Sequence, residues 1–144
     1  MSDTIIGRAP ARADAVQLLE AAGLPTADLT DAHMADFFYC GSPSALVGLV
    51  GLEFRGSDAL LRSLAVAPDG RSAGLGSALV EKAESHARAQ GARSIFLLTT
   101  TAEGFFQRRG YAPADRATAP EAIRASREFG DLCPASAAFL VKHL

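Results

Sequence analysis

The residue pattern with the clearest chemistry is Arg71-x-x-Gly74-x-Gly76, which separates an apolar run from an amphipathic stretch. Glycines let the backbone approach a ligand closely. The first amide groups of a helix are unpaired donors at the positive end of its dipole, an arrangement that suits a phosphate or pyrophosphate. Arg71 adds a fixed positive charge beside these donors. The pattern therefore predicts an anion-binding loop between a strand and a helix.

The spacing of the glycines excludes two common phosphate-binding loops. A P-loop needs a lysine and then a serine or threonine after its last glycine, whereas Gly76 is followed by Ser77 and Ala78. A dinucleotide-binding fingerprint needs a third small residue where Leu79 stands, and an acidic residue after the next strand. Neither pattern fits this sequence.

The elements that position the loop are marked by hydrophobic patterning and by breakers. The apolar run 60–66 predicts the strand that enters the loop, and Pro68 marks the turn. Apolar residues at helical spacing after Gly74 predict a long helix that ends at Gly91. We expect Glu84 and Arg88 to pair one turn apart on the solvent face of this helix.

The rest of the chain alternates strand-like and helix-like segments without repeats. We expect further strands over 4–8, 37–40, 45–55, 94–99, 111–113 and 135–141, helices over 14–22, 102–109 and 120–127, and a short helix or loop at 26–31. Antiparallel hairpins followed by a strand–helix–strand crossover predict an α/β fold, with a mixed central β-sheet flanked by helices on both faces.

Composition indicates one compact domain. The chain of 144 residues is long enough for one domain with a core and too short for two ordinary ones, so we expect a single domain over residues 1–144. It is 49% hydrophobic with a formal net charge of −2, which gives no reason to expect nucleic acid or a membrane as partner. The longest uncharged apolar run, 45–52, is far too short to span a bilayer.

Cysteine and histidine usage predicts no metal site and no disulfide framework. Cys40 and Cys133 lie far apart without metal-ligand spacing, and the histidines are isolated in sequence. Reduced thiols in a cytoplasmic protein are therefore expected. The N-terminus carries early charges and no hydrophobic signal core.

Two stretches resemble the GNAT superfamily of N-acetyltransferases. Arg71-x-x-Gly74-x-Gly76, preceded by Leu64-x-Val66-x-Pro68, resembles its coenzyme A loop, and Thr99-x-x-Ala102-x-x-x-Phe106-x-x-x-Gly110-Tyr111 is similar to its second signature. The resemblance implies a GNAT fold with about six to seven strands, acetyl-CoA as the cofactor, and a small-molecule amine as acceptor, with a homodimer left open. It implies that the cofactor is held by these residues: Leu64, Ala65, Val66, Arg71, Ser72, Ala73, Gly74, Leu75, Gly76, Ser77, Thr99, Ala102 and Phe106.

The sequence departs from the family pattern at four positions. Thr99 stands where an asparagine often supports the pantetheine arm, and Phe106 stands where a tyrosine often protonates the leaving thiolate. Ser72 and Ala73 replace a common glycine and a common basic residue of the loop, which costs little because backbone amides carry the phosphate contact. A phenyl ring gives no proton, so either another donor acts or the thiolate leaves unprotonated.

A narrower resemblance covers nearly the full chain. Segments 23–29, 61–66, 98–103 and 132–137 look like the arsenic-resistance N-acetyltransferases, whose implied acceptors are the glutamate-like amino acids arsinothricin and phosphinothricin. Two alternatives stay open. One is a catalytically inactive domain that binds acyl-CoA, and the other is an enzyme for a polyamine, an aminoglycoside or a protein N-terminus.

Two charged residues on apolar strands are the main catalytic and substrate-binding candidates. Glu53 interrupts the apolar run 49–54 and is either the base that deprotonates the amine or a partner for Arg62 or Arg55. Arg62 alternates in phase with Leu64 and Val66, so we expect it on their face of the strand. There it either binds an acidic group of the acceptor or forms a structural ion pair. Arg55, Arg108 and Arg109 are further anchors.

Hydroxyl and thiol groups supply the remaining candidates. Tyr39 and Cys133 are the nearest replacements for the missing acid, although nothing in the sequence places either beside the sulfur. Thr100 is a candidate for binding the acceptor, whereas Thr101 is expected to cap the helix that begins at Ala102.

Overall fold

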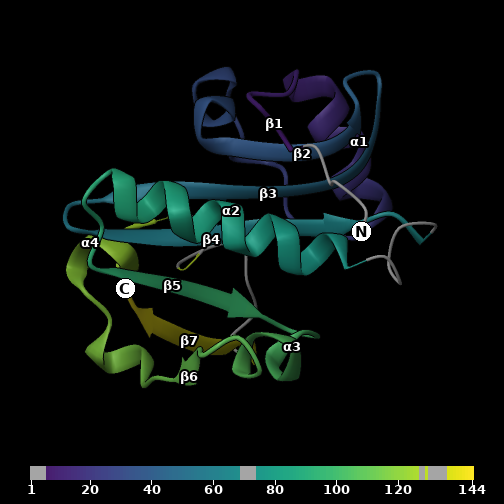
Figure 1. The fold of residues 1–144 in the computed structure, drawn as a ribbon. Coiled ribbons are helices and arrows are strands. Elements are labelled where there is room, and N and C mark those ends of the chain that lie inside the picture. Colours follow the sequence, from purple (N-terminus) through teal and green to yellow (C-terminus); the bar gives the residue numbers. More distant parts are fainter. Residues whose placement is uncertain (1–5, 69–73, 127–128, 130–135) are drawn as a thin grey trace.

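The computed structural model of the protein describes residues 6–68, 74–126, 129 and 136–144 (Figure 1). Its sheet has seven strands in the order β1-β2-β3-β4-β5-β7-β6. The strands are β1 Gly7–Arg8, β2 Phe37–Ser42, β3 Ala45–Arg55, β4 Asp58–Val66, β5 Ser94–Thr99, β6 Ala112–Pro113 and β7 Ala138–His143. The helices are α1 Arg12–Ala21, α2 Leu75–Ala89, α3 Glu103–Gln107 and α4 Glu121–Arg124, with short 3-10 turns η1 Asp31–Asp36 and η3 Arg116–Thr118.

The side chains of each strand alternate between two helix-covered faces. On β2 and β3, Phe37 and Leu49 pack in the cluster of α1, whereas their neighbours Phe38 and Val50 pack in the cluster of α2. Helix α4 packs on the same face of the sheet as α1 but farther along it, against Leu60 and Phe139. The predicted mixed sheet with helices on both faces is therefore confirmed. None of the helices in the described ranges combines the length and apolar character that a membrane span requires.

Strands β4 and β5 separate inside the sheet. They pair in parallel only from Asp58–Ser94 to Leu60–Phe96, although β4 continues to Val66 and β5 to Thr99. Figure 1 shows β5 running away from β4 toward its C-terminal end. Backbone and side chains of both strands are thereby left to bound a cavity instead of a closed ladder.

A β-bulge in β4 places Arg62 on the opposite face of the sheet from the one that the sequence predicted. Leu49 pairs with Ala65 and Gly51 with Arg62, so that one residue of β3 faces both Ser63 and Leu64. Ser63 has a positive φ of 60°, and beyond it Leu64 returns to the α2 face on which Leu61 already lies. The prediction that Arg62 shares the face of Leu64 was therefore wrong, because the bulge shifts the alternation by one residue.

The ends of several elements differ from the sequence expectation. Segment 26–30 is a loop, and the turn η1 that follows it was not predicted. Thr101 does not cap α3: the Thr99 hydroxyl oxygen accepts from the Ala102 amide at 2.9 Å instead. The last strand begins at Ala138, whereas its expected start at 135 lies outside the described residues.

Glu84 on α2 is buried and does not pair with Arg88 on a solvent face, which corrects the sequence prediction. The Tyr111 hydroxyl donates to Glu84 Oε2 at 3.0 Å, and Lys142 Nζ lies 3.1 Å from each carboxylate oxygen. Burial, together with the Glu84 charge, raises the pKa of Tyr111 above its usual range. These contacts tie α2 to β7 across one face of the sheet.

Removing the cation of this cluster should destabilise the protein. We expect Lys142→Met to lower the free energy of unfolding by about 2 kcal/mol, because Glu84 would keep a buried charge without its cation, and Lys142 itself is partly exposed. Urea unfolding measures the change. The control is Arg88→Met, an exposed position that should cost no more than about 0.5 kcal/mol. A larger loss for Arg88→Met than for Lys142→Met would contradict this assignment.

Candidate functional site

Two adjoining cavities lie where β4 and β5 separate. The smaller has a volume of about 210 Å³ and the larger about 800 Å³. Four residues line both, namely Leu24, Leu64, Thr101 and Ala102. We call the smaller the strand cavity, since its walls are the diverging β4 and β5, and the larger the helix groove, since it reaches the N-terminus of α2.

The helix groove has the anion-binding geometry that the sequence predicts. Gly74 caps α2 with a φ of 73°, which favours glycine. The first intrahelical bond runs from the Ala78 amide to the Gly74 carbonyl, so the amides of residues 75–77 precede the hydrogen-bonded turns. A Cβ at Gly76 would lie 3.3 Å from the Phe105 ring, so a side chain here would require that ring to shift by a few tenths of an ångström. Arg71, Ser72 and Ala73 lie outside the described residues.

Arg109 joins α3 to the start of α2. Its guanidinium donates to the Ser77 hydroxyl and, at 3.0 Å, to the Phe105 carbonyl, and lies 3.7 Å from the centre of the Phe105 ring. These partners are neutral, so the positive charge of Arg109 is not compensated by them. Arg108 lines the same groove. The groove therefore combines positive charge with the first α2 amides, which precede the hydrogen-bonded turns and make no hydrogen bond to another described residue. This combination fits a phosphorylated cofactor.

The strand cavity is lined by hydroxyl groups, backbone and apolar side chains. Its hydroxyls belong to Ser63 on β4 and to Thr99, Thr100 and Thr101 at the end of β5. Phe106 also lines it and packs edge-on against Phe105 and Tyr111 in the core, with ring centroids 5.1 and 5.4 Å away. Across both cavities, every charged side chain of a described lining residue belongs to an arginine: Arg62, Arg108 or Arg109.

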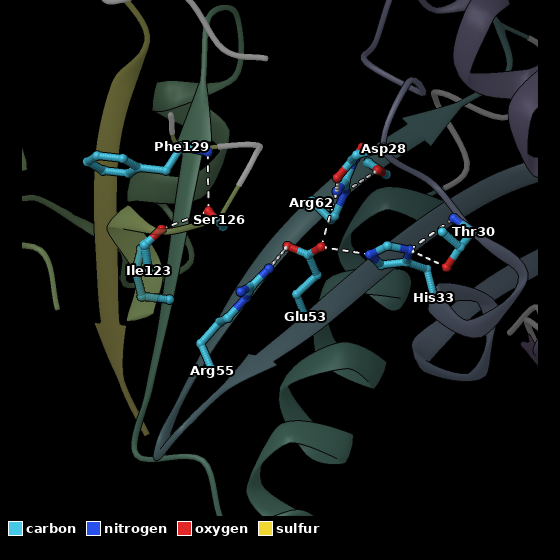
Figure 2. Close-up of polar contacts among 10 residues, drawn as sticks. Asp28, Thr30, His33, Glu53, Arg55, Arg62, Ile123, Ser126 and Phe129 are labelled. Atoms are coloured by element: carbon cyan, nitrogen blue, oxygen red, sulfur yellow. Dashed lines mark hydrogen bonds and ion pairs between the residues drawn. The ribbon is translucent and has the colours of Figure 1, made fainter. Parts of the chain in front are cut away.

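Arg62 is the centre of a buried polar network (Figure 2). Its guanidinium makes a bidentate pair with Asp28, at 2.5 and 2.9 Å, and Nε donates to the Ser63 hydroxyl oxygen at 3.0 Å. A longer contact of 3.4 Å reaches Glu53 Oε1. Burial opposes ionisation of Asp28, but the hydrogen bond and charge of Arg62 outweigh it and lower the pKa of Asp28. The Arg62 side chain has no exposed surface.

Glu53 lies behind Arg62 and lines a separate cavity of about 230 Å³ with His33 and Arg55. The Thr30 amide donates to His33 Nδ1 at 3.0 Å, so in the neutral ring the proton is on Nε2, which donates to Glu53 Oε1 at 2.9 Å. Figure 2 shows Glu53 between this imidazole and the two arginines. Pairing of Glu53 with Arg62 and Arg55, one of its two predicted roles, is therefore confirmed.

The same network shows why a metal ion is not assigned here. Ligand atoms of Asp28, His33 and Glu53 lie within 4.8 Å of one another, close enough to share an ion. However, the Arg62 guanidinium already contacts both carboxylates, and both ring nitrogens of His33 are engaged. A cation at this position would have to displace a guanidinium of the same charge sign.

The predicted site residues divide between the cavities. Those that line only the helix groove are Ala65, Val66, Gly74, Gly76 and Ser77, those that line only the strand cavity are Arg62, Thr99, Thr100 and Phe106, and Leu64 and Ala102 line both. Leu75 packs against the core of α2, and Tyr39 packs with the cluster of α1 away from both cavities. Cys133 lies outside the described residues. Sequence reasoning missed the roles of Asp28, His33 and Ser63, because their partners are distant in sequence or depend on the bulge.

Comparison with known proteins identifies an enzyme family. A model of the acetyltransferase (GNAT) family matches residues 13–111. An uncharacterised N-acetyltransferase from Chlorobaculum tepidum is 36% identical over 92 residues, 63% of this chain and 59% of that protein. The amino-acid acetyltransferase of Pseudomonas fluorescens is 44% identical over 66 residues, 46% of this chain and 15% of that protein. The chain thus spans only part of each of these relatives.

Solved structures share the fold. N-acetylglutamate synthase from Neisseria gonorrhoeae, in complex with coenzyme A and N-acetyl-glutamate, has a TM-score of 0.81 at 23% identity over 100% of this chain and 36% of that chain. A Mycobacterium tuberculosis protein in complex with CoA has a TM-score of 0.77 at 22% identity over 97% and 99% of the two chains. These likenesses confirm the fold predicted from the sequence.

Arg109 should contribute to the affinity for coenzyme A through a phosphate. We expect Arg109→Gln to weaken binding roughly tenfold, because one charge-assisted contact is lost. Isothermal titration calorimetry with coenzyme A measures the change, and pantetheine, which lacks phosphates, is the reference ligand. Arg124→Gln, an exposed arginine on α4, is the control. Equal losses for coenzyme A and pantetheine would mean that Arg109 only supports Phe105.

Proposed function

The chain belongs to the acetyltransferase (GNAT) family, and from this premise we propose that it is an N-acetyltransferase with acetyl-CoA as donor and a small glutamate-like amino acid as acceptor. The predicted superfamily is thereby confirmed, and the enzyme class and cofactor follow from it as part of this proposal. The proposed acceptor carries a second acidic group, as arsinothricin and phosphinothricin do.

The main support for this proposal is the sign of the charged side chains that line the two cavities. All charged side chains among the described lining residues are arginines, so an anionic acceptor meets no carboxylate there. A polyamine or aminoglycoside would find no acidic side chain among them to pair with. The likeness to amino-acid acetyltransferases and to N-acetylglutamate synthase supports an amino acid as acceptor.

When bound, acetyl-CoA would supply the acetyl thioester for the reaction. The amine nitrogen bonds to the acetyl carbon, the carbon–sulfur bond breaks, the nitrogen gives up a proton and the sulfur ends as a thiol. The first α2 amides and the groove arginines would hold the phosphates, while the strand cavity would orient the amine. The described lining residues include no carboxylate, histidine or tyrosine. We therefore assign removal of the amine proton to water.

We assign Glu53 an indirect role. Its carboxylate accepts from His33 and contacts Arg62, and Glu53 itself lines neither the strand cavity nor the helix groove. It thus acts on the acceptor through the position of Arg62, with His33 holding it from the other side. Tyr39 lies away from the cavities, so Cys133 remains the proposed proton donor to the sulfur.

An acceptor panel tests the proposed function. Enzyme and acetyl-CoA are incubated with glutamate, phosphinothricin, arsinothricin, methionine sulfone, glutamine or spermidine, and free thiol is followed. We expect the best acidic amino acid to exceed glutamine in kcat/KM by at least about tenfold, the value of one charged contact. Spermidine as the preferred acceptor would contradict the proposal.

The missing tyrosine generates a second test. We expect Phe106→Tyr to change kcat little, because Cys133 already supplies the proton, and a strong rise would show that protonation of the sulfur limits turnover and would remove Cys133 as the donor. Cys133→Ala should lower kcat with coenzyme A affinity unchanged. Unaltered kcat in both variants would show that the thiolate leaves without a protein donor.

A further inference from the structure

Ser63 lines the strand cavity from a strained backbone position. Ser63 lies in the bulge of β4 with a φ of 60°, a conformation that disfavours any residue with a Cβ, and it is 9% exposed. Glycine would satisfy this backbone without strain. The backbone conformation therefore gives no reason for a serine at this position, and the group by which serine differs from alanine is its hydroxyl.

The hydrogen bond from Arg62 orients this hydroxyl. A guanidinium nitrogen can only donate, so the contact of 3.0 Å from Arg62 Nε makes the Ser63 oxygen the acceptor. The hydroxyl proton must then point elsewhere, and within the described part of the chain Ser63 Oγ makes no other hydrogen bond. Because Ser63 lines the strand cavity, that proton is available to a ligand there.

The Arg62 guanidinium, in contrast to the Ser63 hydroxyl, is not positioned to bind a ligand in the strand cavity. Its side chain has no exposed surface, and its charge is paired with the carboxylates of Asp28 and Glu53. Two of its nitrogens are fixed by the bidentate pair with Asp28, which sets the direction of Nε toward Ser63. Arg62 thus orients the Ser63 hydroxyl. Because Arg62 donates to the hydroxyl oxygen, the hydroxyl group becomes a stronger hydrogen-bond donor.

We propose that Ser63 donates a hydrogen bond to an anionic oxygen of the acceptor, and that Arg62 is a positioning residue that acts through Ser63. This inference rests on the proposed acidic amino-acid acceptor. The chemical class that it selects is an acceptor with a carboxylate, phosphinate or arsinate oxygen, because a polarised hydroxyl donor is strengthened most by a charged partner. Recognition then comes from an oriented dipole and not from an exposed charge.

Two substitutions of Ser63 separate the hydroxyl from the backbone. Ser63→Ala removes the hydroxyl and keeps the strain, whereas Ser63→Gly removes the hydroxyl and relieves the strain. We expect both to raise KM for the best acidic amino acid about tenfold to a hundredfold, as for one hydrogen bond to a charged group. Coenzyme A affinity should stay unchanged. Ser126→Ala, another buried serine that lines neither cavity, is the matched control.

Each outcome decides the inference. Wild-type KM in Ser63→Gly would show that only the bulge geometry matters, and wild-type KM in both variants would remove Ser63 from acceptor binding. Failure of this inference is distinguishable from failure of the proposed function, because the wild-type panel alone sets the acceptor class. Repeating the Ser63→Ala assay with glutamine and with the α-amide of glutamate identifies the oxygen, since the loss should vanish for the compound that lacks it.

A double-mutant cycle tests the role of Arg62. If Arg62 acts through Ser63, Arg62→Lys should raise KM several-fold in the wild-type background and have little effect in the Ser63→Ala background. If Arg62 binds the acceptor directly, the two effects multiply and the positioning role is overturned. Thermal unfolding of all variants confirms that they are folded, and the KM changes are compared only among folded proteins.

Discussion

The separation of β4 from β5 is the constraint on which the rest of the site depends. The strands share only the pairs from Asp58–Ser94 to Leu60–Phe96, and beyond them two strand ends lie inside the sheet without pairing to each other. A sheet gains stability by closing such edges. In this protein the edges stay apart. The strand cavity lies between the two strand ends, and the helix groove continues from it to the start of α2.

Different interactions support the two sides of this opening. On the β4 side, Arg62 ties the strand to Asp28 in the loop before η1, with two short hydrogen bonds that are protected from solvent. On the α3 side, Arg109 connects α3 to Ser77 at the start of α2 and stacks on Phe105. Since buried ion pairs gain their energy only when their geometry is satisfied, the Arg62–Asp28 pair fixes β4 against this loop, whereas Arg109 holds α3 against α2 through neutral partners.

The sequence predicted the elements well and the side-chain environments less well. The bounds of β3 and β5 agree with the expected 45–55 and 94–99, because each is an apolar run closed by turn residues. The α2 start follows from Gly74, whose positive φ demands glycine. The bulge at Ser63 could not be predicted, since strict alternation has no signal for an inserted residue. Burial of Glu84 was equally hidden, because its cation, Lys142, is 58 residues away.

The distribution of charged side chains indicates that the two anionic ligands would be recognised by different interactions in this opening. Around β4, Arg62 and Arg55 are balanced by Asp28 and Glu53, so this network has little net charge. The groove arginine Arg109 bonds to a hydroxyl, a carbonyl and an aromatic ring, all neutral, and so keeps its charge for a ligand. Net positive charge attracts phosphates over a distance and with little regard to shape. A neutral, oriented hydroxyl acts only at contact distance, and we therefore expect the cofactor to be attracted by charge and the acceptor to be selected by geometry.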